Sequence, residues 1–248
     1  MEITENEKVL IRPFRRRSEP EISADAMMVM IPSDLEYLLN INKGKEILQI
    51  NSGFFQTNII RESTGKSISI SGPFTGAPQA VMGMEKLIAM GAKRVWVLGW
   101  CGSLQPNLRI GDFLIPFKAV SEEGTSRHYP ITDKNPGTSL NLNSMIEKSL
   151  EKMGRTCQKG LVWTTDAPYR ETALKVTQYS DEGIMAVEME MAALITLSIY
   201  RNVELAGLLV VSDELFDLKW KPGFSDPTLK KSSRFAGKVL LDIITTDC

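Results

Sequence analysis

The chain has 248 residues, of which 43% are hydrophobic and 24% charged, and its formal net charge is -1. These totals are typical of a soluble globular protein with a sizeable core, and they exclude binding to nucleic acid through a general basic excess. No uncharged run is long enough to cross a bilayer, and the charged N-terminus lacks a signal-peptide pattern. We therefore expect a cytoplasmic protein with no nucleic-acid or membrane partner.

Cysteine and histidine usage argues against a metal centre. Cys101, Cys157 and Cys248 are far apart and lack a CxxC spacing, which is typical of free thiols in a reducing compartment. His128 is the only histidine in the sequence, so a histidine-based metal site is not expected. We expect no metal and no bound cofactor.

Residues 1–25 are mostly polar and contain the basic run from Arg12 to Arg17. We expect an extended N-terminal arm here, followed by a single domain over residues 26–248. The basic run is either a solvated patch or a functional element, namely an anion clamp or an arm between subunits.

From residue 26 onwards, strand-like and helix-like segments alternate. Short apolar or alternating runs indicate strands, and apolar residues at helical spacing that end at glycine or proline indicate helices. This alternation favours one three-layer α/β/α domain with a parallel or mixed, partly barrel-like sheet. The expected strands are residues 26–31, 47–50, 54–60, 67–71, 95–98, 113–120, 160–165, 183–187 and 205–211, and the expected helices are residues 35–39, 77–90, 143–153, 170–180, 188–200 and 227–245.

The most informative stretch is the uncharged strand at residues 95–98, a pattern typical of a strand buried on both faces. A glycine-bounded turn from Gly99 to Gly102 is expected to follow, where glycine permits a sharp turn and the close approach of another group. Ligands of open α/β sheets bind beyond the carboxyl ends of such strands. Substrate is therefore expected at Gly99–Ser103, together with the strand-end segments Gly72–Pro78 and Ser212–Glu214.

Asp213 is the carboxyl group expected to act as an acid. Only Ser212 separates it from the apolar run at residues 205–211, so partial desolvation is expected to raise its pKa towards neutrality. The alternative, which the position alone favours, is a structural Asp at the N-cap of a helix.

Glu188 and Glu190 begin the helix expected over residues 188–200. On a helix this spacing points them to nearly opposite faces, so they are not an acid and base pair. One of them, in an apolar setting, could accept hydrogen bonds from sugar hydroxyls. The alternative is a favourable charge at a helix N-terminus.

Three other motifs are incomplete. Thr64–Ser67 looks like the end of a phosphate-binding P-loop, but Ile60 stands where its first glycine is required. Gly72–Gly76 does not make the GxGxxG of a dinucleotide fold. Ser126–His128, even with Asp133, lacks a GxSxG nucleophile motif, so a hydrolase triad is not expected.

Five short motifs lie in one order between residues 26 and 245: Gly72…Gly76-Ala-Pro78, Gly99-Trp-Cys-Gly-Ser-Leu-Gln…Ile110-Gly-Asp112, Glu123-Gly-Thr-Ser-Arg-His-Tyr129, Val187-Glu-Met-Glu-Met-Ala-Ala193 and Val211-Ser-Asp213. Together they resemble the nucleoside phosphorylase family, which contains uridine phosphorylases, hexameric purine nucleoside phosphorylases and methylthioadenosine nucleosidases. The resemblance implies a mixed, barrel-like sheet and cleavage of the N-glycosidic bond of a nucleoside.

The resemblance also implies roles for individual residues. Asp213 matches the acid that protonates the leaving base in the purine enzymes, which favours a purine-like base over uridine, and Lys231 loosely matches a basic residue that assists it. Glu190 matches the Glu that binds ribose, with Met189 under the sugar. The segment Thr165–Arg170 matches the base-binding segment of the family. The remaining positions matched to the substrate site are Glu188, Thr165, Pro168 and Ser212, and those matched to the anion-binding turn are Gly76, Gly99, Trp100, Cys101 and Gly102.

The anion site departs from the family pattern. Family phosphorylases hold phosphate with a Gly and an Arg after the first strand, where this chain has Met30–Glu36, and with an Arg where it has Val97. Trp100 replaces a small hydroxyl residue, and its indole would fill space that phosphate needs. A phosphate dianion without guanidinium partners is poorly stabilised. Arg15–Arg17 or Arg127 could supply the missing charge from elsewhere.

We therefore expect an enzyme that cleaves a nucleoside, with phosphorolysis as the family default. Hydrolysis is the alternative, in which Asp34 or Glu36 on the first strand-end loop would activate water. The alternative of another class is a nucleoside-binding protein without turnover. The expected partners are a nucleoside, inorganic phosphate as a co-substrate if the reaction is phosphorolysis, and further copies of the chain in a homodimer or hexamer.

Overall fold

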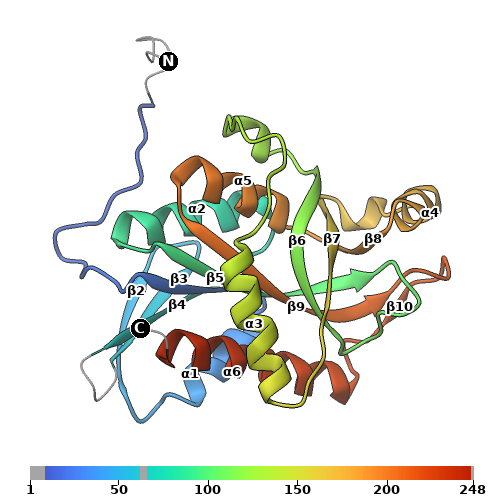
Figure 1. The fold of residues 1–248 in the computed structure, drawn as a ribbon. Coiled ribbons are helices and arrows are strands. Elements are labelled where there is room, and N and C mark those ends of the chain that lie inside the picture. Colours follow the sequence, from blue (N-terminus) through green and yellow to red (C-terminus); the bar gives the residue numbers. More distant parts are fainter. Residues whose placement is uncertain (1–8, 62–65, 247–248) are drawn as a thin grey trace.

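The computed structural model describes residues 9–61 and 66–246, and Figure 1 shows how their elements are arranged. Residues 1–8 of the expected arm, Thr64 and Gly65 of the Thr64–Ser67 segment and Cys248 lie outside the described residues. The arm from residue 9 to residue 24 contains no helix or strand, and part of it lies against the body, where Lys86 donates to the Phe14 carbonyl at 2.9 Å and the Ile22 N–H donates to the Met90 carbonyl at 2.9 Å. Within the described residues, no helix combines the length and the apolar character needed to span a membrane.

The elements follow the alternating order expected from the sequence. The strands are β1 (Asp25–Val29), β2 (Glu46–Asn51), β3 (Gln56–Arg61), β4 (Ser67–Gly72), β5 (Arg94–Ser103), β6 (Phe113–Glu122), β7 (Gln158–Thr165), β8 (Ile184–Glu188), β9 (Glu204–Glu214) and β10 (Lys221–Pro222). The α-helices are α1 (Pro32–Asn40), α2 (Ala77–Met90), α3 (Leu140–Lys152), α4 (Ala173–Asp181), α5 (Met191–Arg201) and α6 (Pro227–Thr246), and two short 3-10 helices lie at η2 (Ser126–His128) and η3 (Pro168–Arg170).

The strands form one mixed sheet that partly closes on itself. Its order is β10-β9-β6-β7-β8-β5-β1-β4-β3-β2, and β9 also pairs with β5. The additional pairing closes β9, β6, β7, β8 and β5 into a five-stranded ring, from which β1, β4, β3 and β2 extend as an open sheet. Parallel pairs such as β5–β9 and antiparallel pairs such as β6–β9 both occur, which confirms the mixed, partly barrel-like architecture.

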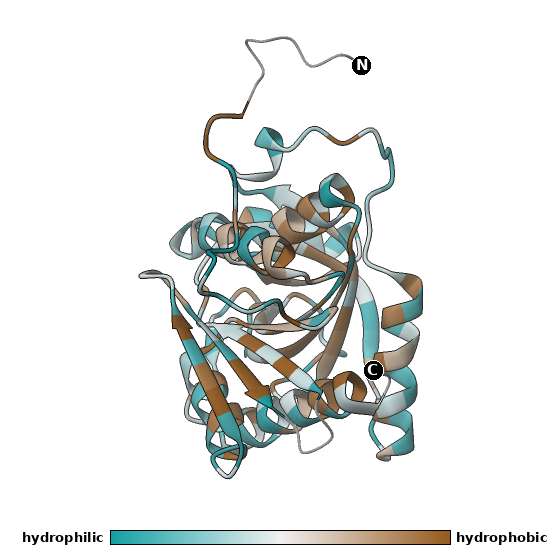
Figure 2. Cartoon of the chain, turned by 90° about the vertical axis from the view of Figure 1, so that its left-hand side faces the viewer, coloured by the Kyte–Doolittle hydropathy of each residue, from teal (hydrophilic) through white to brown (hydrophobic). Residues whose placement is uncertain are grey.

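Helices cover the sheet on both sides, with α2 and α5 over one face and α1, α3 and α6 over the other (Figure 1). Alternate residues of a strand point to opposite faces, so a strand between two helical layers must be apolar throughout. In β5, Val95 and Val97 pack with the α2–α5 layer, whereas Trp96 and Leu98 pack with the opposite layer. The hydrophobic strands between the helices are visible in Figure 2.

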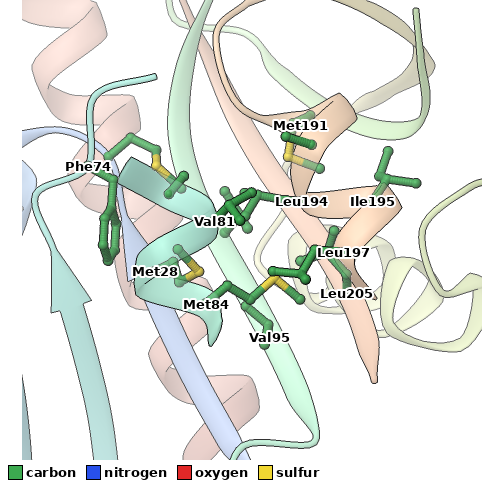
Figure 3. Close-up of a cluster of buried hydrophobic side chains, with 14 of the residues drawn as sticks. Met28, Phe74, Val81, Met84, Val95, Met191, Leu194, Ile195, Leu197 and Leu205 are labelled. Atoms are coloured by element: carbon green, nitrogen blue, oxygen red, sulfur yellow. The ribbon is translucent and has the colours of Figure 1, made fainter. Parts of the chain in front are cut away.

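The layer between α2, α5 and the sheet is the largest of the three apolar clusters among the described residues (Figure 3). Its side chains come from strands and helices far apart in the sequence, so this packing fixes the ends of the strands relative to one another. Members labelled in Figure 3 are Met28, Phe74, Val81, Met84, Val95, Met191, Leu194, Ile195, Leu197 and Leu205.

Two expected strand ends are wrong. The turn expected at Gly99–Gly102 does not exist, because β5 continues to Ser103 and stays hydrogen-bonded to β9, with a register shift between Cys101 and Gly102. Similarly, Ser212–Glu214 is not a loop but the last part of β9. In both cases pairing with a distant strand overrides the local signal from glycine and serine.

Two expected helix starts are also wrong. Helix α5 begins at Met191 instead of residue 188, so Glu188 is the last residue of β8 and Glu190 is the N-cap of the helix. Helix α1 begins at Pro32, so Asp34 and Glu36 are helical and do not lie on a loop.

A glycine inside α2 provides a test of the packing. A Cβ at Gly83 would lie 2.1 Å from Cε1 of the buried Phe74 ring. Alanine is intrinsically better than glycine in a helix by about 1 kcal/mol, but overpacking a core costs about 1–3 kcal/mol. We expect Gly83→Ala to lower the free energy of unfolding in urea, whereas Gly44→Ala, where nothing lies within 4 Å, is expected to change it little. A Gly83→Ala variant as stable as the wild type would contradict this packing.

Candidate active site

The carboxyl ends of β5, β8 and β9 meet at one edge of the closed ring. Gly102 of β5 is paired with Val187 of β8 and with Asp213 of β9. A Cβ at Gly102 would lie 3.0 Å from Oδ2 of Asp213 and 3.3 Å from Cγ1 of Val187. The absence of a side chain at Gly102 therefore lets the expected acid and the end of β8 approach each other closely.

Asp213 is half-buried and has a hydrogen-bond donor at each carboxylate oxygen. The Ser212 hydroxyl donates to Oδ1 at 2.6 Å, and Nε1 of Trp220 donates to Oδ2 at 3.0 Å. Because Asp213 lies inside β9, the alternative that it caps a helix is excluded. The two donors fix the orientation of the carboxylate at the strand end.

Glu171 is a second carboxyl group near Asp213, and the sequence analysis missed it. Burial, together with the negative charge of Asp213, raises the pKa of Glu171 to about 7. The residue directly follows the segment Thr165–Arg170 that was assigned to the base. A carboxyl group whose charge is disfavoured in this way keeps its proton closer to neutral pH.

Glu188 and Glu190 have different partners although they are both buried. Glu188 accepts hydrogen bonds from the backbone N–H groups of Glu190 and Met191, each at 2.7 Å, and from the Thr164 hydroxyl. This carboxylate thus caps α5. Oε1 of Glu190 instead reaches across to the N-terminus of α2 and accepts the Gly76 N–H at 2.6 Å. Of the two, Glu190 is the one placed between separate elements.

The burial of these two carboxyl groups changes their protonation. Desolvation raises the pKa of Glu188, although the three hydrogen bonds it accepts oppose that effect. Desolvation and the charge of Glu188 both raise the pKa of Glu190. Raised carboxyl pKa values in a cluster at strand ends are typical of functional sites.

The expected base-binding segment connects β7 to α4. Thr165 is buried at the end of β7, and its hydroxyl accepts the Ala167 N–H at 3.2 Å. Asp166 accepts the Gly124 N–H at 2.9 Å, which ties this segment to the loop before η2. Pro168 begins the exposed η3, and Met189 is half-buried between Glu188 and Glu190.

On the expected anion side, a tryptophan replaces the small hydroxyl residue and is firmly held. Nε1 of Trp100 donates to Oγ of Ser233 on α6 at 2.8 Å, and that hydroxyl donates to Oδ2 of Asp34 at 2.5 Å. The Trp100 ring also stacks on Phe224, with 6.1 Å between ring centroids. Burial raises the pKa of Asp34, while hydrogen bonds from Ser233 and Trp100 and the charge of Arg234 oppose the increase.

The other residues expected around the anion are apolar, or, for Cys101, a thiol that does not ionise. Val97 is buried in the α2–α5 layer, 1% exposed. Gly99 lies in β5, where a Cβ would meet Leu209 and Met30 at 3.2 Å. Burial raises the pKa of the Cys101 thiol, so this group stays protonated. No grouping of three or more His, Cys, Asp or Glu side chains suited to a metal occurs among the described residues.

The basic residues expected to assist are elsewhere. Lys231 lines a groove on the outer face of α6 with Tyr37 and Arg155. In the arm, Arg15 donates to the backbone carbonyl of Glu19 at 2.8 Å, and the backbone N–H of Arg16 donates to the Glu19 carboxylate at 2.7 Å. The described contacts connect none of these cations to Asp213. The roles of Lys231 and of the arm in the reaction therefore stay predictions.

Comparison with known proteins agrees with this geometry. The family model described as "Phosphorylase superfamily" matches residues 26–245, so the chain belongs to this superfamily. The chain is 31% identical over 154 residues to a DeoD-type purine nucleoside phosphorylase of Bacillus cereus, a match that covers 61% of this chain and 66% of that relative.

Solved structures share the fold. A purine nucleoside phosphorylase from Toxoplasma gondii, in complex with immucillin-H, has a TM-score of 0.79 at 21% identity and 90% coverage of both chains. Uridine phosphorylase from Vibrio fischeri gives 0.79 at 21% identity, covering 91% of this chain and 93% of its own. A futalosine hydrolase mutant from Helicobacter pylori gives 0.74 at 18% identity, covering 89% and 98%. Proteins named as phosphorylases and as a hydrolase thus share this architecture.

The raised pKa of Glu190 has a consequence for stability. In the folded protein this carboxyl group keeps its proton above the ordinary value of 4.5, whereas in the unfolded chain it loses it there. The folded state therefore binds more protons, and the free energy of unfolding falls as pH rises from about 4.5 into the neutral range. Glu190→Gln keeps the acceptor for the Gly76 N–H but cannot ionise. We expect its free energy of unfolding in urea to fall less than that of the wild type from pH 5 to pH 8; equal slopes would contradict the assignment.

Proposed function

We propose that the protein cleaves the N-glycosidic bond of a purine nucleoside, with Asp213 as the acid that protonates the leaving base. The observation that carries this proposal is the placement of Asp213 at the ring edge, with both oxygens oriented by donors and a second carboxyl group, Glu171, nearby. As the C1′–N bond breaks, its electron pair moves to the base, and a proton from an acid lowers the barrier. Glu171, whose pKa is raised to about 7 in part by the charge of Asp213, holds a proton near this acid close to neutral pH.

The sugar would be held by Glu190 and Met189. The Gly76 N–H fixes one carboxylate oxygen of Glu190 at the start of α2, which presents this side chain between β8 and α2. A carboxyl group in this position can accept hydrogen bonds from ribose hydroxyls. Glu188 is engaged with the backbone of α5 and instead holds Glu190 and Met191 in place.

Water is the nucleophile that the anion side favours. By the family resemblance, the Trp100 indole would fill the space that a phosphorylase gives to phosphate, and this indole is hydrogen-bonded through Ser233 to the buried Asp34. A phosphate dianion beside a buried carboxylate would be repelled, whereas water would not. The raised pKa of Asp34 makes it a suitable base for one proton of that water, the oxygen of which would bond to C1′.

Phosphorolysis is the second candidate, and two observations favour it. The curated relative in Bacillus cereus is named as a purine nucleoside phosphorylase, and the charge of Arg234 acts on Asp34, so one guanidinium is near the anion side. In that reaction inorganic phosphate is a co-substrate and no cofactor is needed. A homodimer or hexamer, as expected from the family resemblance, stays a proposal.

A panel of purine and pyrimidine nucleosides, incubated with and without phosphate, distinguishes the candidates. We expect release of free purine base at the same rate in both conditions, because water can occupy a site that excludes a dianion, and much slower release from uridine. Release that requires phosphate would establish phosphorolysis. No release from any nucleoside, with ligand-induced thermal stabilisation retained, would favour a binding protein without turnover.

Substitution of the acid gives a second test. Asp213→Asn preserves the size of the side chain and keeps one oxygen that accepts a hydrogen bond, but it cannot donate the proton. We expect kcat for purine nucleosides to fall by about 10²–10⁴-fold, the usual contribution of a general acid. Asp217→Asn, at an exposed position three residues beyond β9, serves as the matched control and is expected to retain activity. Unchanged turnover in Asp213→Asn would rule out the acid role.

A further inference from the structure

A groove of about 400 Å³ on the outer face of α6 gathers five cationic side chains, and its lining contains no carboxylate. It lies against α1, through Tyr37, and against the chain that follows α3, through Arg155. The groove thus combines side chains from separate elements that only the fold brings together. Its cations are Arg155, Lys230, Lys231, Arg234 and Lys238.

These cations have no close carboxylate partner among the described residues, although the charge of Arg234 acts on Asp34. Within residues 9–61 and 66–246, none of the five forms an ion pair with a carboxylate. Lys230 and Lys231 also lie near the N-terminus of α6, where the helix dipole disfavours positive charge, and the acidic group at that end, Asp226, is already engaged with the Thr228 N–H at 2.8 Å. Such a concentration of charge opposes folding in a chain with a net charge of only -1.

Aromatic rings hold the guanidinium groups in position. The guanidinium carbon of Arg234 lies 4.6 Å from the Tyr37 ring centroid, and that of Arg155 lies 5.3 Å from the Phe235 ring centroid. The ammonium group of Lys238 lies 5.9 Å from the Tyr37 centroid. Stacking of this kind lowers the entropy that a guanidinium loses when it binds an anion in a bidentate manner.

From this arrangement we propose that the groove binds a small ligand with two or more adjacent phosphoryl groups. One such anion would relieve the repulsion between the cations and the unfavourable charge at the start of α6 at the same time. Five cations exceed what a single phosphate needs, and the volume lies in the range of small-ligand sites. The cations surround one groove instead of forming a long stripe, which disfavours a nucleic-acid backbone as the ligand.

The proposal does not rest on the proposed glycosidic cleavage, because the groove and the ring edge share only Arg234, whose charge acts on Asp34, and Lys231, the residue expected to assist Asp213. Tripolyphosphate, which carries no base, and adenosine, which carries no phosphate, separate the two sites. In isothermal titration calorimetry of the full chain, we expect tripolyphosphate to bind, ATP to compete with it and adenosine not to compete. The affinity is expected to fall as salt is added.

Substitutions locate the site. We expect Lys230→Gln combined with Lys238→Gln to weaken tripolyphosphate binding by about tenfold or more, since each loses a charged hydrogen-bond donor. Lys93→Gln combined with Lys134→Gln removes the same charge at exposed positions outside the groove and is expected to leave the affinity unchanged. Absence of tripolyphosphate binding, or equal weakening in both double variants, would overturn the proposal. Tighter, groove-dependent binding of a single-stranded oligonucleotide would assign the groove to nucleic acid instead.

Discussion

The pairing of β5 with β9 is the constraint on which the rest of the structure depends. The two strands run in parallel from Arg94 beside Glu204 to Ser103 beside Glu214, and this contact closes the five-stranded ring. The backbone hydrogen bonds of two central strands hold the far ends of both at one edge. Gly102 and Asp213 consequently lie side by side as a backbone pair, and the rigid sheet holds the site in place.

Several carboxyl groups, among them Asp213 and Glu190, lie at that edge of the sheet, and their hydrogen bonds and burial differ. Asp213 accepts hydrogen bonds from Ser212 and Trp220, whereas Glu190 accepts a backbone N–H and is surrounded by buried groups. Burial and hydrogen bonding act in opposite directions on a carboxyl pKa, and at Glu190 burial prevails and raises the pKa. The carboxyl groups at one edge of the sheet are therefore not equivalent.

Much of the fold was predictable because the central strands are apolar on both faces. Met27 and Met28 of β1 already show this, since each packs in a different layer. The ends of β5 and β9 were not predictable, because Gly99, Gly102 and Ser212 signal a turn locally while pairing between strands more than 100 residues apart in the sequence keeps them extended. Local signals carry no information on such pairing.

In the candidate site, too, some residues could be predicted from the sequence and others could not. Asp213 and Glu190 could be selected from the sequence, because each follows an apolar strand. Neither Glu171 nor Ser233 could be placed at the site without the structure, since the first follows an exposed loop and the second lies within a long helix. The charge of Asp213 acts on Glu171 only once the ring closes, and Ser233 donates to Asp34 only once α6 packs on α1.

Two of the four tryptophans, Trp96 and Trp163, are almost completely buried, whereas Trp100 and Trp220 lie at the ring edge and flank Phe224. The indole of Trp220 is 63% exposed and hydrogen-bonded to the acid itself. The protein thus carries intrinsic fluorophores beside its candidate acid and against Asp34, with two shielded ones as an internal reference. Quenching of tryptophan fluorescence by a water-soluble agent therefore measures whether a ligand occupies this edge. The measurement needs neither a label nor turnover.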